Sequence, residues 1–384
     1  MVAPSFGFGK KAPMRQPWHS FLVHLTGLLL GEAMLADLAK CQAPASSASS
    51  QYRSAYFLGR GNTGIAIADQ EEAIFYNPAG LALGQGIYKK TVLLSPQVEF
   101  SRATRDLVRQ LTAENADAID AVRGNIGTPN HLGLQNFTGI LFRRVALGAI
   151  TSSNTDILAF KSVDDGGLEA IRVATDQTMG LTFSLAESFF ANQLYLGITG
   201  KYLLHGKGYV AASVSDIDRI KEQINDRKNF IGLGQGEGAD IGLMYKGNSR
   251  TPWSLGLTVN DVGDTRIRPS DETNMGLNFK QTINAGFAIE PGTKTSKLRL
   301  LIDYRDIQSR VERNPRKKLH TGAELVVAGA VGLTGGLNQG YPTGGFFVDL
   351  YLLRLDLGFY TEEMGSTVGS RPDTRYVMRL KAGF

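Results

Sequence analysis

Residues 374–384 at the carboxyl end read TRYVMRLKAGF, and every second residue counted back from the end is apolar. The apolar residues are Tyr376, Met378, Leu380, Ala382 and Phe384, and Arg375, Arg379 and Lys381 lie between them. A period of two predicts a β-strand with one apolar and one polar face. About ten alternating residues also match the length of a tilted strand that crosses a membrane. A strand of a soluble β-sandwich can alternate in the same way, so this stretch alone leaves both folds open.

Thirteen further segments show strand-like patterns, which gives fourteen predicted strands, an even number. The clearest is 353–360 (LRLDLGFY), where leucines and a phenylalanine alternate with Arg354, Asp356 and Gly358. The predicted strands are 91–100, 131–142, 145–158, 168–186, 193–212, 237–246, 252–266, 279–290, 297–306, 318–327, 330–339, 343–351, 353–362 and 374–384.

The connections between these segments alternate between short and long. Short ones include 187–192 (ESFFAN) and 291–296 (PGTKTS), and long ones include 101–130 and 213–236. Short turns at one rim and long loops at the other are typical of bacterial outer-membrane barrels. The sequence therefore predicts an all-β, membrane-spanning antiparallel barrel of about fourteen strands, in which 374–384 is the closing strand and pairs with 91–100.

Two long loops contain helical patterns, at 104–122 and 215–229. In the second, Ser215 or Asp216 can cap a run with isoleucines at helical spacing. Surface helices of this kind are common, so the pattern predicts local structure and does not by itself indicate a function.

The amino end predicts an export signal. Lys10, Lys11 and Arg15 form a basic region, and 21–30 (FLVHLTGLLL) is an apolar core that small residues follow. This core is shorter than the roughly 20 residues that a spanning helix needs. We therefore predict a signal peptide over 1–48, a hatch or plug over 49–90 and a barrel over 91–384, exported through the periplasm to the cell outer membrane.

The composition excludes several classes of function. The 41 basic and 36 acidic residues give a net charge of +5 without a concentrated basic stripe, so we predict no binding to nucleic acid. Cys41 is the single cysteine, so there is no disulfide framework. The five histidines show no metal-ligand spacing, and no G-x-S-x-G motif occurs. We predict no metal, no cofactor and no enzymatic activity, although a barrel hydrolase could assemble serine and histidine from separate strands.

The polar faces of the predicted strands carry charges of both signs. They include Arg299, Asp303, Arg305, Glu324, Arg354, Asp356, Arg379 and Lys381. Because charges in a barrel interior are best paired, this mixture predicts an internal salt-bridge network rather than a pore selective for one sign of ion. The alternative is that these side chains simply face water in the lumen.

Residues 49–89 do not fit the strand pattern. Asp69 can cap a short helix with Glu71 and Glu72 in its first turn, and Asn77-Pro78 can start a second one. A fourteen-strand barrel is too wide for its own side chains to fill, so this segment is a candidate plug. The alternative is a periplasmic tail below the barrel. The run 59–64 (GRGNTG) fits a dinucleotide-binding pattern but lacks the strand–helix context that the pattern requires.

The run 59–82, GRGNTGIAIADQEEAIFYNPAGLA, resembles the amino-terminal region of outer-membrane transporters of long-chain fatty acids and aromatic hydrocarbons. It is also similar to related secretion-associated barrels and conjugation-associated proteins. The shared features are a Gly-rich opening, an Ala- and acid-rich turn and Asn-Pro-Ala. In the transporters this region is the hatch inside a fourteen-strand barrel, and Asn77, Pro78 and Ala79 match its motif.

The resemblance implies passive uptake of a hydrophobic compound such as a long-chain fatty acid. The candidate substrate-binding residues are Phe75, Tyr76, Asn77, Pro78 and Ala79. The alternative is a non-transporting outer-membrane scaffold or a secretion-system partner, whose loop helices would carry protein contacts. The predicted partners are outer-membrane lipid, a hydrophobic small-molecule ligand and the barrel-assembly machinery. If the alternative function holds, a secretion partner joins them. The assembly machinery would recognise Phe384, which resembles the aromatic end that such machinery selects.

Overall fold

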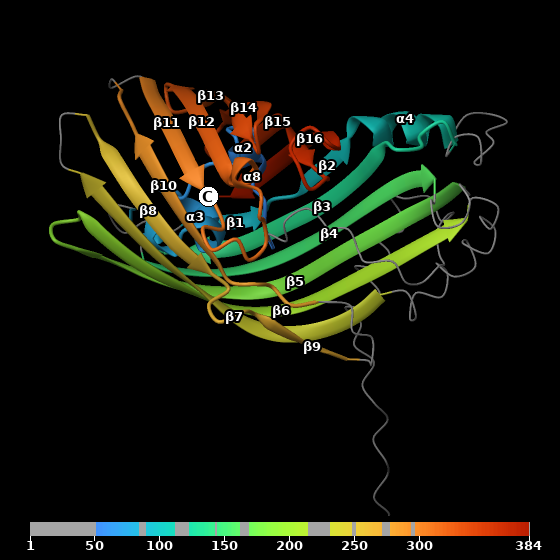
Figure 1. Cartoon of the computed structure of the whole chain (residues 1–384). Coiled ribbons are helices and arrows are strands. Elements are labelled where there is room, and N and C mark those ends of the chain that lie inside the picture. Colours follow the sequence, from blue (N-terminus) through green and yellow to red (C-terminus); the bar gives the residue numbers. More distant parts are fainter. Residues whose placement is uncertain are drawn as a thin grey trace, which may run out of the picture. The chain divides into compact units, whose positions relative to one another are not determined.

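The chain forms a closed antiparallel barrel (Figure 1). A computed structural model describes residues 51–83, 90–111, 123–142, 144–161, 169–213, 231–247, 251–270, 277–292 and 296–383. The strands of this described part are β1 (Lys90–Leu94), β2 (Gln97–Ser101), β3 (Pro129–Leu141), β4 (Val145–Lys161), β5 (Glu169–Phe189), β6 (Leu194–Ser213), β7 (Ile231–Gly247), β8 (Trp253–Asn260), β9 (Arg266–Pro269), β10 (Thr282–Ile289), β11 (Ser296–Tyr304), β12 (Leu319–Val327), β13 (Val331–Asn338), β14 (Tyr341–Asp349), β15 (Leu353–Glu363) and β16 (Pro372–Gly383).

The sixteen strands of the described residues occupy fourteen positions in the wall. Strands β1 and β2 share one position, because both pair with β3 and with β16. Strands β8 and β9 share another, because both pair with β7. The predicted count of fourteen is confirmed, and so is the closure, in which Met378 of β16 lies opposite Val98 of β2.

The closing strand shows why this barrel belongs in a membrane. Its apolar residues are exposed, with 48% of Met378 accessible, whereas Arg379 is 1% accessible and faces the interior. A soluble sandwich would bury the apolar face and expose the charges. The reversed arrangement is that of a membrane-spanning barrel, with apolar side chains toward lipid and polar ones toward the lumen.

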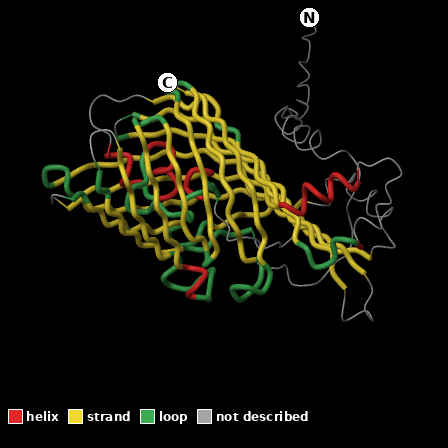
Figure 2. Tube along the Cα trace, turned by 90° about the horizontal axis from the view of Figure 1, so that it is seen from above, coloured by secondary structure: helices red, strands yellow, loops and turns green. Residues whose placement is uncertain are grey.

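The wall is much taller on one side than on the other, as the tube in Figure 2 shows. Strands β5 and β6 have 21 and 20 residues, whereas β10 and β14 have 8 and 9. At about 3.3 Å per residue, 20 residues extend about 66 Å. The hydrocarbon core of a bilayer is only about 30 Å thick. The tall side, β3 to β7, therefore extends beyond the membrane at the end where the long loops lie.

The helices are short. They are α2 (Ala55–Leu58), α3 (Gln70–Tyr76), η1 (Pro78–Leu83), α4 (Arg102–Leu111) and α8 (Pro315–Lys318). Within the described ranges, no helix combines the length and the apolar character needed to cross a membrane. Helix α4 confirms the first part of the helix predicted over 104–122. The rest of that helix, the helix predicted over 215–229, the predicted signal over 1–48 and Phe384 lie outside the described residues.

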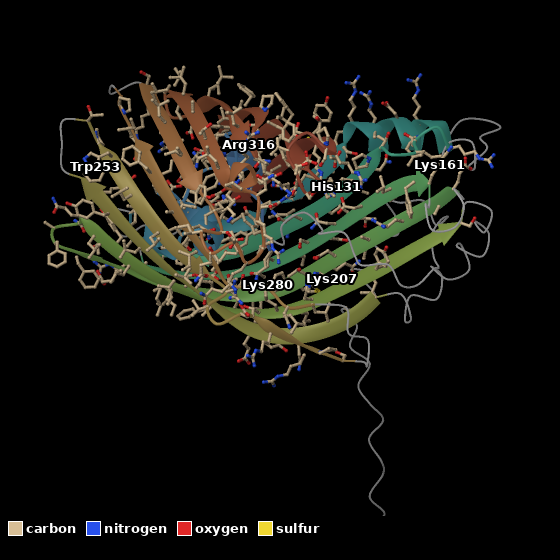
Figure 3. All side chains as sticks on the ribbon, in the orientation of Figure 1. His131, Lys161, Lys207, Trp253, Lys280 and Arg316 are labelled. Carbon is tan, nitrogen blue, oxygen red and sulfur yellow. The ribbon has the colours of Figure 1, made fainter. Side chains whose placement is uncertain are left out.

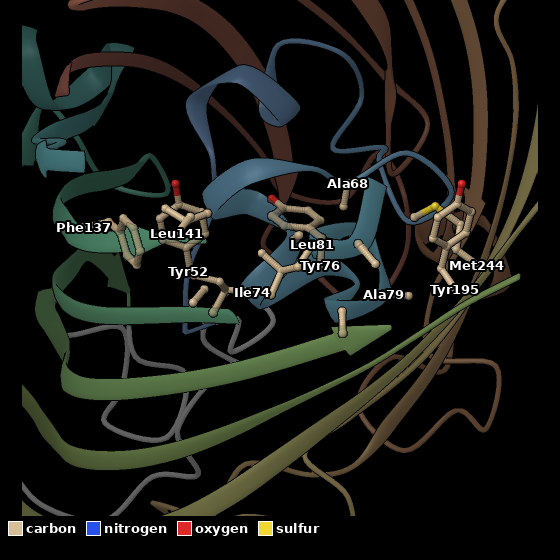
Figure 4. Packing of buried hydrophobic residues seen from close by; sticks show 14 of the residues in the cluster. Tyr52, Ala68, Ile74, Tyr76, Ala79, Leu81, Phe137, Leu141, Tyr195 and Met244 are labelled. Atoms are coloured by element: carbon tan, nitrogen blue, oxygen red, sulfur yellow. The ribbon is translucent and has the colours of Figure 1, made fainter. Parts of the chain in front are cut away.

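Residues 51–83 lie inside the barrel and are here called the plug (Figure 4). Helix α2 packs against β14, β15 and β16, and η1 packs against β5, β6 and β7. The location inside the wall excludes the alternative of a periplasmic tail. Asp69 stands at the start of α3 as predicted, but its side chain makes no capping hydrogen bond. Pro78 begins η1, as the Asn-Pro pair predicts.

Candidate functional site

The plug meets the tall side of the wall through apolar side chains (Figure 4). The ring of Phe75 stacks on Tyr52 with the ring centroids 4.4 Å apart, and its edge meets Phe137 of β3 at 5.8 Å. The plug contributes Tyr52, Phe57, Ala68, Ala73, Ile74, Tyr76, Ala79, Leu81 and Ala82 to this cluster. The wall contributes Val92 of β1 and, from β3 to β7, Phe137, Leu141, Ala146, Ile150, Ala186, Tyr195 and Met244. We call this contact, which runs from β3 to β7, the apolar half of the interface.

The Asn-Pro-Ala motif docks the plug on the wall. The Asn77 amide donates to the carbonyls of Ile65 (2.8 Å) and Leu243 (3.1 Å), and its side-chain oxygen accepts from the Ala79 N–H at 3.2 Å. Asparagine suits this buried position because one side chain supplies donors and an acceptor. Gly242 of β7 faces the motif, where a Cβ would overlap the Asn77 side chain. The motif therefore links the plug to β7.

The five predicted substrate-binding residues lie together, but in different environments. Phe75 is half-buried, whereas Tyr76, Asn77, Pro78 and Ala79 are buried. The Tyr76 hydroxyl donates to the side chain of Asn62 at 3.0 Å, and its ring meets the Phe57 ring at 4.5 Å. These contacts are part of the plug's own packing. The role of the five residues in binding a ligand stays a prediction.

The opposite side of the plug is held by buried ion pairs with β2, β12, β15 and β16, which we call the ionic half. Arg379 donates to Glu72 of the plug at 2.7 Å and to Asp356 of β15 at 2.9 Å. Lys381 donates to Glu71 at 2.6 Å. Further pairs join plug Arg53 to Glu99 and Glu362, and plug Arg60 to Glu324. The predicted internal salt-bridge network is confirmed, and it connects the wall to the plug as well as strand to strand.

Tyr56 of the plug is the aromatic centre of the ionic half. The guanidinium carbons of Arg60 and Arg354 lie 4.4 Å and 4.3 Å from the centroid of its ring. Its hydroxyl donates to Glu324 of β12 at 2.6 Å. Contacts between a guanidinium and an aromatic face are attractive and strengthen when water is excluded. Tyr56 thus adds a cation–π contact to the pairing of charges.

A cavity of about 550 Å³ borders the ionic half. It is lined by Tyr56, Asp69, Gln70 and Glu72 of the plug and by Lys297, Arg299, Glu324, Val326, Phe347, Asp349, Arg354 and Lys381 of the wall. Ala328 and Gly329, in the short turn between β12 and β13, place it at the short-turn end of the barrel. Its volume matches a small-molecule site, but its lining carries more charge than such sites usually have.

Acid is expected to weaken the docking of the plug through Glu71. Burial raises the pKa of this carboxyl. The positive charges of Lys381, Lys90 and Arg379 lower it by more than burial raises it, so the pKa lies below its ordinary value of 4.5. A carboxyl with a lowered pKa stabilises the fold above its unfolded pKa, and this contribution is lost as the pH falls. We expect wild type to exceed Glu71→Gln in thermal stability at pH 6. The difference in melting temperature, followed by circular dichroism, should shrink below pH 4.5, and a constant difference would contradict this role.

Sequence reasoning identified Glu324, Arg379 and Lys381 among the wall charges of the ionic half but missed Glu99 and Glu362. It also missed the plug partners Arg53, Tyr56 and Arg60. Nothing in the local pattern of 52–60 (YRSAYFLGR) indicates which strand each side chain meets. A second missed feature is Gly197 on β6, which lies against Pro78 and Ala79. Glycine inside a predicted strand can mark the close approach of another backbone, and this signal was present in the sequence.

No protein-family model matches the chain, and no curated protein matches it. Among solved structures, the fold is similar to that of a mutant of the monoaromatic hydrocarbon channel TodX, with a TM-score of 0.50 and 11% identity over 87% of this chain and 98% of that one. The toluene transporters TbuX of Ralstonia pickettii and TodX of P. putida match with TM-scores of 0.46 and 0.43. Their identities are 11% and 12%, and the matches cover 85% and 88% of this chain and 96% and 97% of theirs. At such identity the likeness concerns the fold, and at that level the resemblance predicted from 59–82 is confirmed.

Proposed function

We propose that the chain is an outer-membrane channel for passive uptake of small hydrophobic compounds, opened by movement of the plug. The observation that carries the proposal is the two-sided attachment of the plug, apolar toward β3 to β7 and ionic toward β2, β12, β15 and β16. A monoaromatic hydrocarbon channel has a similar fold, which supports the same class of cargo. Long-chain fatty acids are the narrower candidate that follows from the resemblance of 59–82.

The ionic half is the side that we expect to open. Three of its charged groups, Glu72, Glu324 and Lys381, border the cavity of about 550 Å³, so water can reach these groups as their ion pairs separate. Water cannot replace the contacts of the apolar half in this way, because its aromatic rings would lose their packing and be exposed to water. The plug would therefore tilt about its contact with β3 to β7 and widen the existing cavity.

A buried apolar cluster lies on the long-loop side of the plug. Thr199 of β6 contacts the plug through the Ile74 carbonyl, and Leu203 lies four residues further toward the long loops. There Leu203 forms a buried cluster with Ile267, Leu277 and Phe279. These side chains are 0–5% accessible, so we infer that the cluster parts to admit a hydrophobic compound toward Phe75.

A reversible cross-link between plug and wall tests the proposal. A Cβ at Gly59 of the plug would lie 3.1 Å from the Cα of Gly345 on β14, and a Cβ at Gly345 would lie 3.1 Å from the Cα of Gly59. Both distances are shorter than ordinary contact, so the plug must shift from β14 by a few tenths of an ångström for two cysteines here to reach the Cβ separation of about 3.8 Å that a disulfide needs. In a Cys41→Ser background, the pair Gly59→Cys and Gly345→Cys should abolish uptake of labelled fatty acid or toluene into liposomes when oxidised. Reduction should restore uptake.

The single variants Gly59→Cys and Gly345→Cys are the controls, since neither can form the bond. Uptake that is equal in the oxidised and reduced double variant would show that compounds cross without movement of the plug. Comparing fatty acid with toluene in the same vesicles separates the broad class of cargo from the narrower candidate.

A second function, that of a non-transporting scaffold or secretion partner, is favoured by the density of buried ion pairs in the interior. On this hypothesis the charges keep the plug closed permanently, and uptake is at background level in wild type as well as in the reduced double variant. A binding partner should then be recovered with the intact barrel and lost when 215–229 is trimmed. Recovery of no partner, together with reversible uptake, would dismiss the scaffold.

A further inference from the structure

A basic patch lies on the outer surface of the wall at β9. Arg266 and Arg268 are exposed, whereas Ile267 between them is 5% accessible and packs inside with Phe279. The two arginines therefore face away from the lumen. Lys280, labelled in Figure 3, is also exposed, and Arg310 lies nearby, bound to Asp264 through two contacts of 2.7 Å and 2.9 Å. We call Arg266, Arg268, Lys280 and Arg310 the basic patch.

The patch lies at the edge of the apolar band. On the outer face of β7, exposed Tyr245, Leu243 and Ile241 succeed one another from the short turn onward. Further along the same strand, Glu237 pairs with Arg266 and Gln235 with Arg268. A basic side chain on the lipid face costs roughly 2–4 kcal/mol at the centre of the bilayer and little near its surface. The two arginines therefore mark the level of the lipid headgroups on the long-loop side.

The charge balance of this area favours an anion. Within the described residues, the four cations of the patch face three acids. Glu237 lies beside Arg266, Asp264 beside Arg310, and the buried Asp306 also acts on Arg310. Arg268 lies opposite the uncharged side chain of Gln235. An arginine fork binds two oxygens of a phosphate at once, which makes it well suited to a phosphorylated headgroup.

Exposed apolar side chains adjoin the patch. Val262, in the interruption between β8 and β9, is 40% accessible, and Ile307, just beyond β11, is 45% accessible. Their backbones are held to the wall, since the Val262 N–H donates to Ala239 and the Ile307 N–H donates to Ile283. A charged area directly beside such side chains has the polarity of a lipid, with a headgroup at one end and acyl chains at the other.

We propose that the outer face of β7 and β9 binds a lipid whose headgroup carries phosphate monoesters. The phosphates contact Arg266 and Arg268, with Lys280 adding positive charge, and the acyl chains lie along Val262 and Ile307. This site lies on the outer surface of the barrel, so it is separate from the plug and from the passage of cargo inside.

The test is retention of lipid by the full-length barrel in detergent, measured by native mass spectrometry with diphosphorylated lipid A or phosphatidylcholine as the probe. Wild type should retain lipid A, and the double variant Arg266→Gln and Arg268→Gln should retain it about tenfold less, the loss that corresponds to about 1.4 kcal/mol. The matched control, Arg144→Gln with Lys246→Gln, removes two cations near the short turns and should behave like wild type.

Equal retention by the double variant and wild type would overturn the proposal, as would equal retention of the two lipids by wild type. Displacement of lipid A by millimolar inorganic phosphate would identify a site for the free anion instead of the lipid. An unchanged shift between heated and unheated samples on electrophoresis shows that the variants fold. Uptake is not measured, so failure here leaves the proposed transport untouched.

Discussion

Replacing Arg379 with methionine is expected to have the largest effect on stability, a loss of about 3–5 kcal/mol in the free energy of unfolding. The guanidinium is 1% accessible and joins Glu72 of the plug to Asp356 of the wall. Its removal leaves two buried carboxylates without their main partner. The barrel should melt at a lower temperature, and trypsin should cleave the plug at Arg53 or Arg60 more rapidly.

Arg144 provides the comparison, since its ion pair with Glu187 is exposed, with 40% and 44% of the side chains accessible. Such surface pairs contribute about 0–1 kcal/mol, so Arg144→Met should leave stability nearly unchanged. Adding Glu72→Leu to Arg379→Met should recover part of the lost stability, because it removes a carboxylate that Arg379→Met leaves buried and unpaired. Equal effects of Arg379→Met and Arg144→Met would show that the buried network does not hold the plug.

Gly197→Ala is expected to displace the plug and open the barrel to ions. A Cβ at Gly197 of β6 would overlap backbone atoms of Pro78 and Ala79, which cannot turn away as a side chain can. Overpacking of this kind typically costs about 1–3 kcal/mol, and movement of the plug relieves it. We expect frequent openings in planar bilayers, where wild type stays closed.

Gly200, on the same strand, is the matched control, since the nearest atom to a Cβ there lies 3.9 Å away, in ordinary contact. Gly200→Ala should therefore conduct like wild type. If both variants conducted alike, the docking of Asn-Pro-Ala on β6 would not be what keeps the barrel closed.

The wall could be predicted from the sequence because each strand repeats the same local rule, apolar toward lipid and polar toward the lumen. The rule weakens where glycine replaces side chains. The segment 231–238 (IGLGQGEG) belongs to β7, but the prediction began that strand at residue 237. The predicted strand 252–266 is interrupted in the structure, because Asp261 and Asp264 take positive φ angles there. Aspartate tolerates this conformation better than most residues, so the break had a local signal.

The site was harder to predict, because its contacts join residues that are distant in the sequence. Tyr56 and Glu324 are 268 residues apart, and no periodic pattern indicates that they meet. Glu71 and Glu72 looked like acids placed for the helix dipole, whereas in the structure they pair with Lys381 and Arg379 of the last strand. The residues predicted to bind cargo were chosen by resemblance, and the structure places them in the packing and docking of the plug.

The ionic half has a consequence for how the molecule is put together. The plug comes before every wall strand in the chain, yet Arg379 and Lys381, which hold Glu72 and Glu71, belong to β16, the last strand. The same strand supplies the hydrogen-bonded edge that seals the ring against β1 and β2. The strand that closes the ring therefore also brings the acids of α3 the cations they contact. We expect a barrel whose last strand has not yet paired to hold its plug more loosely than the finished one.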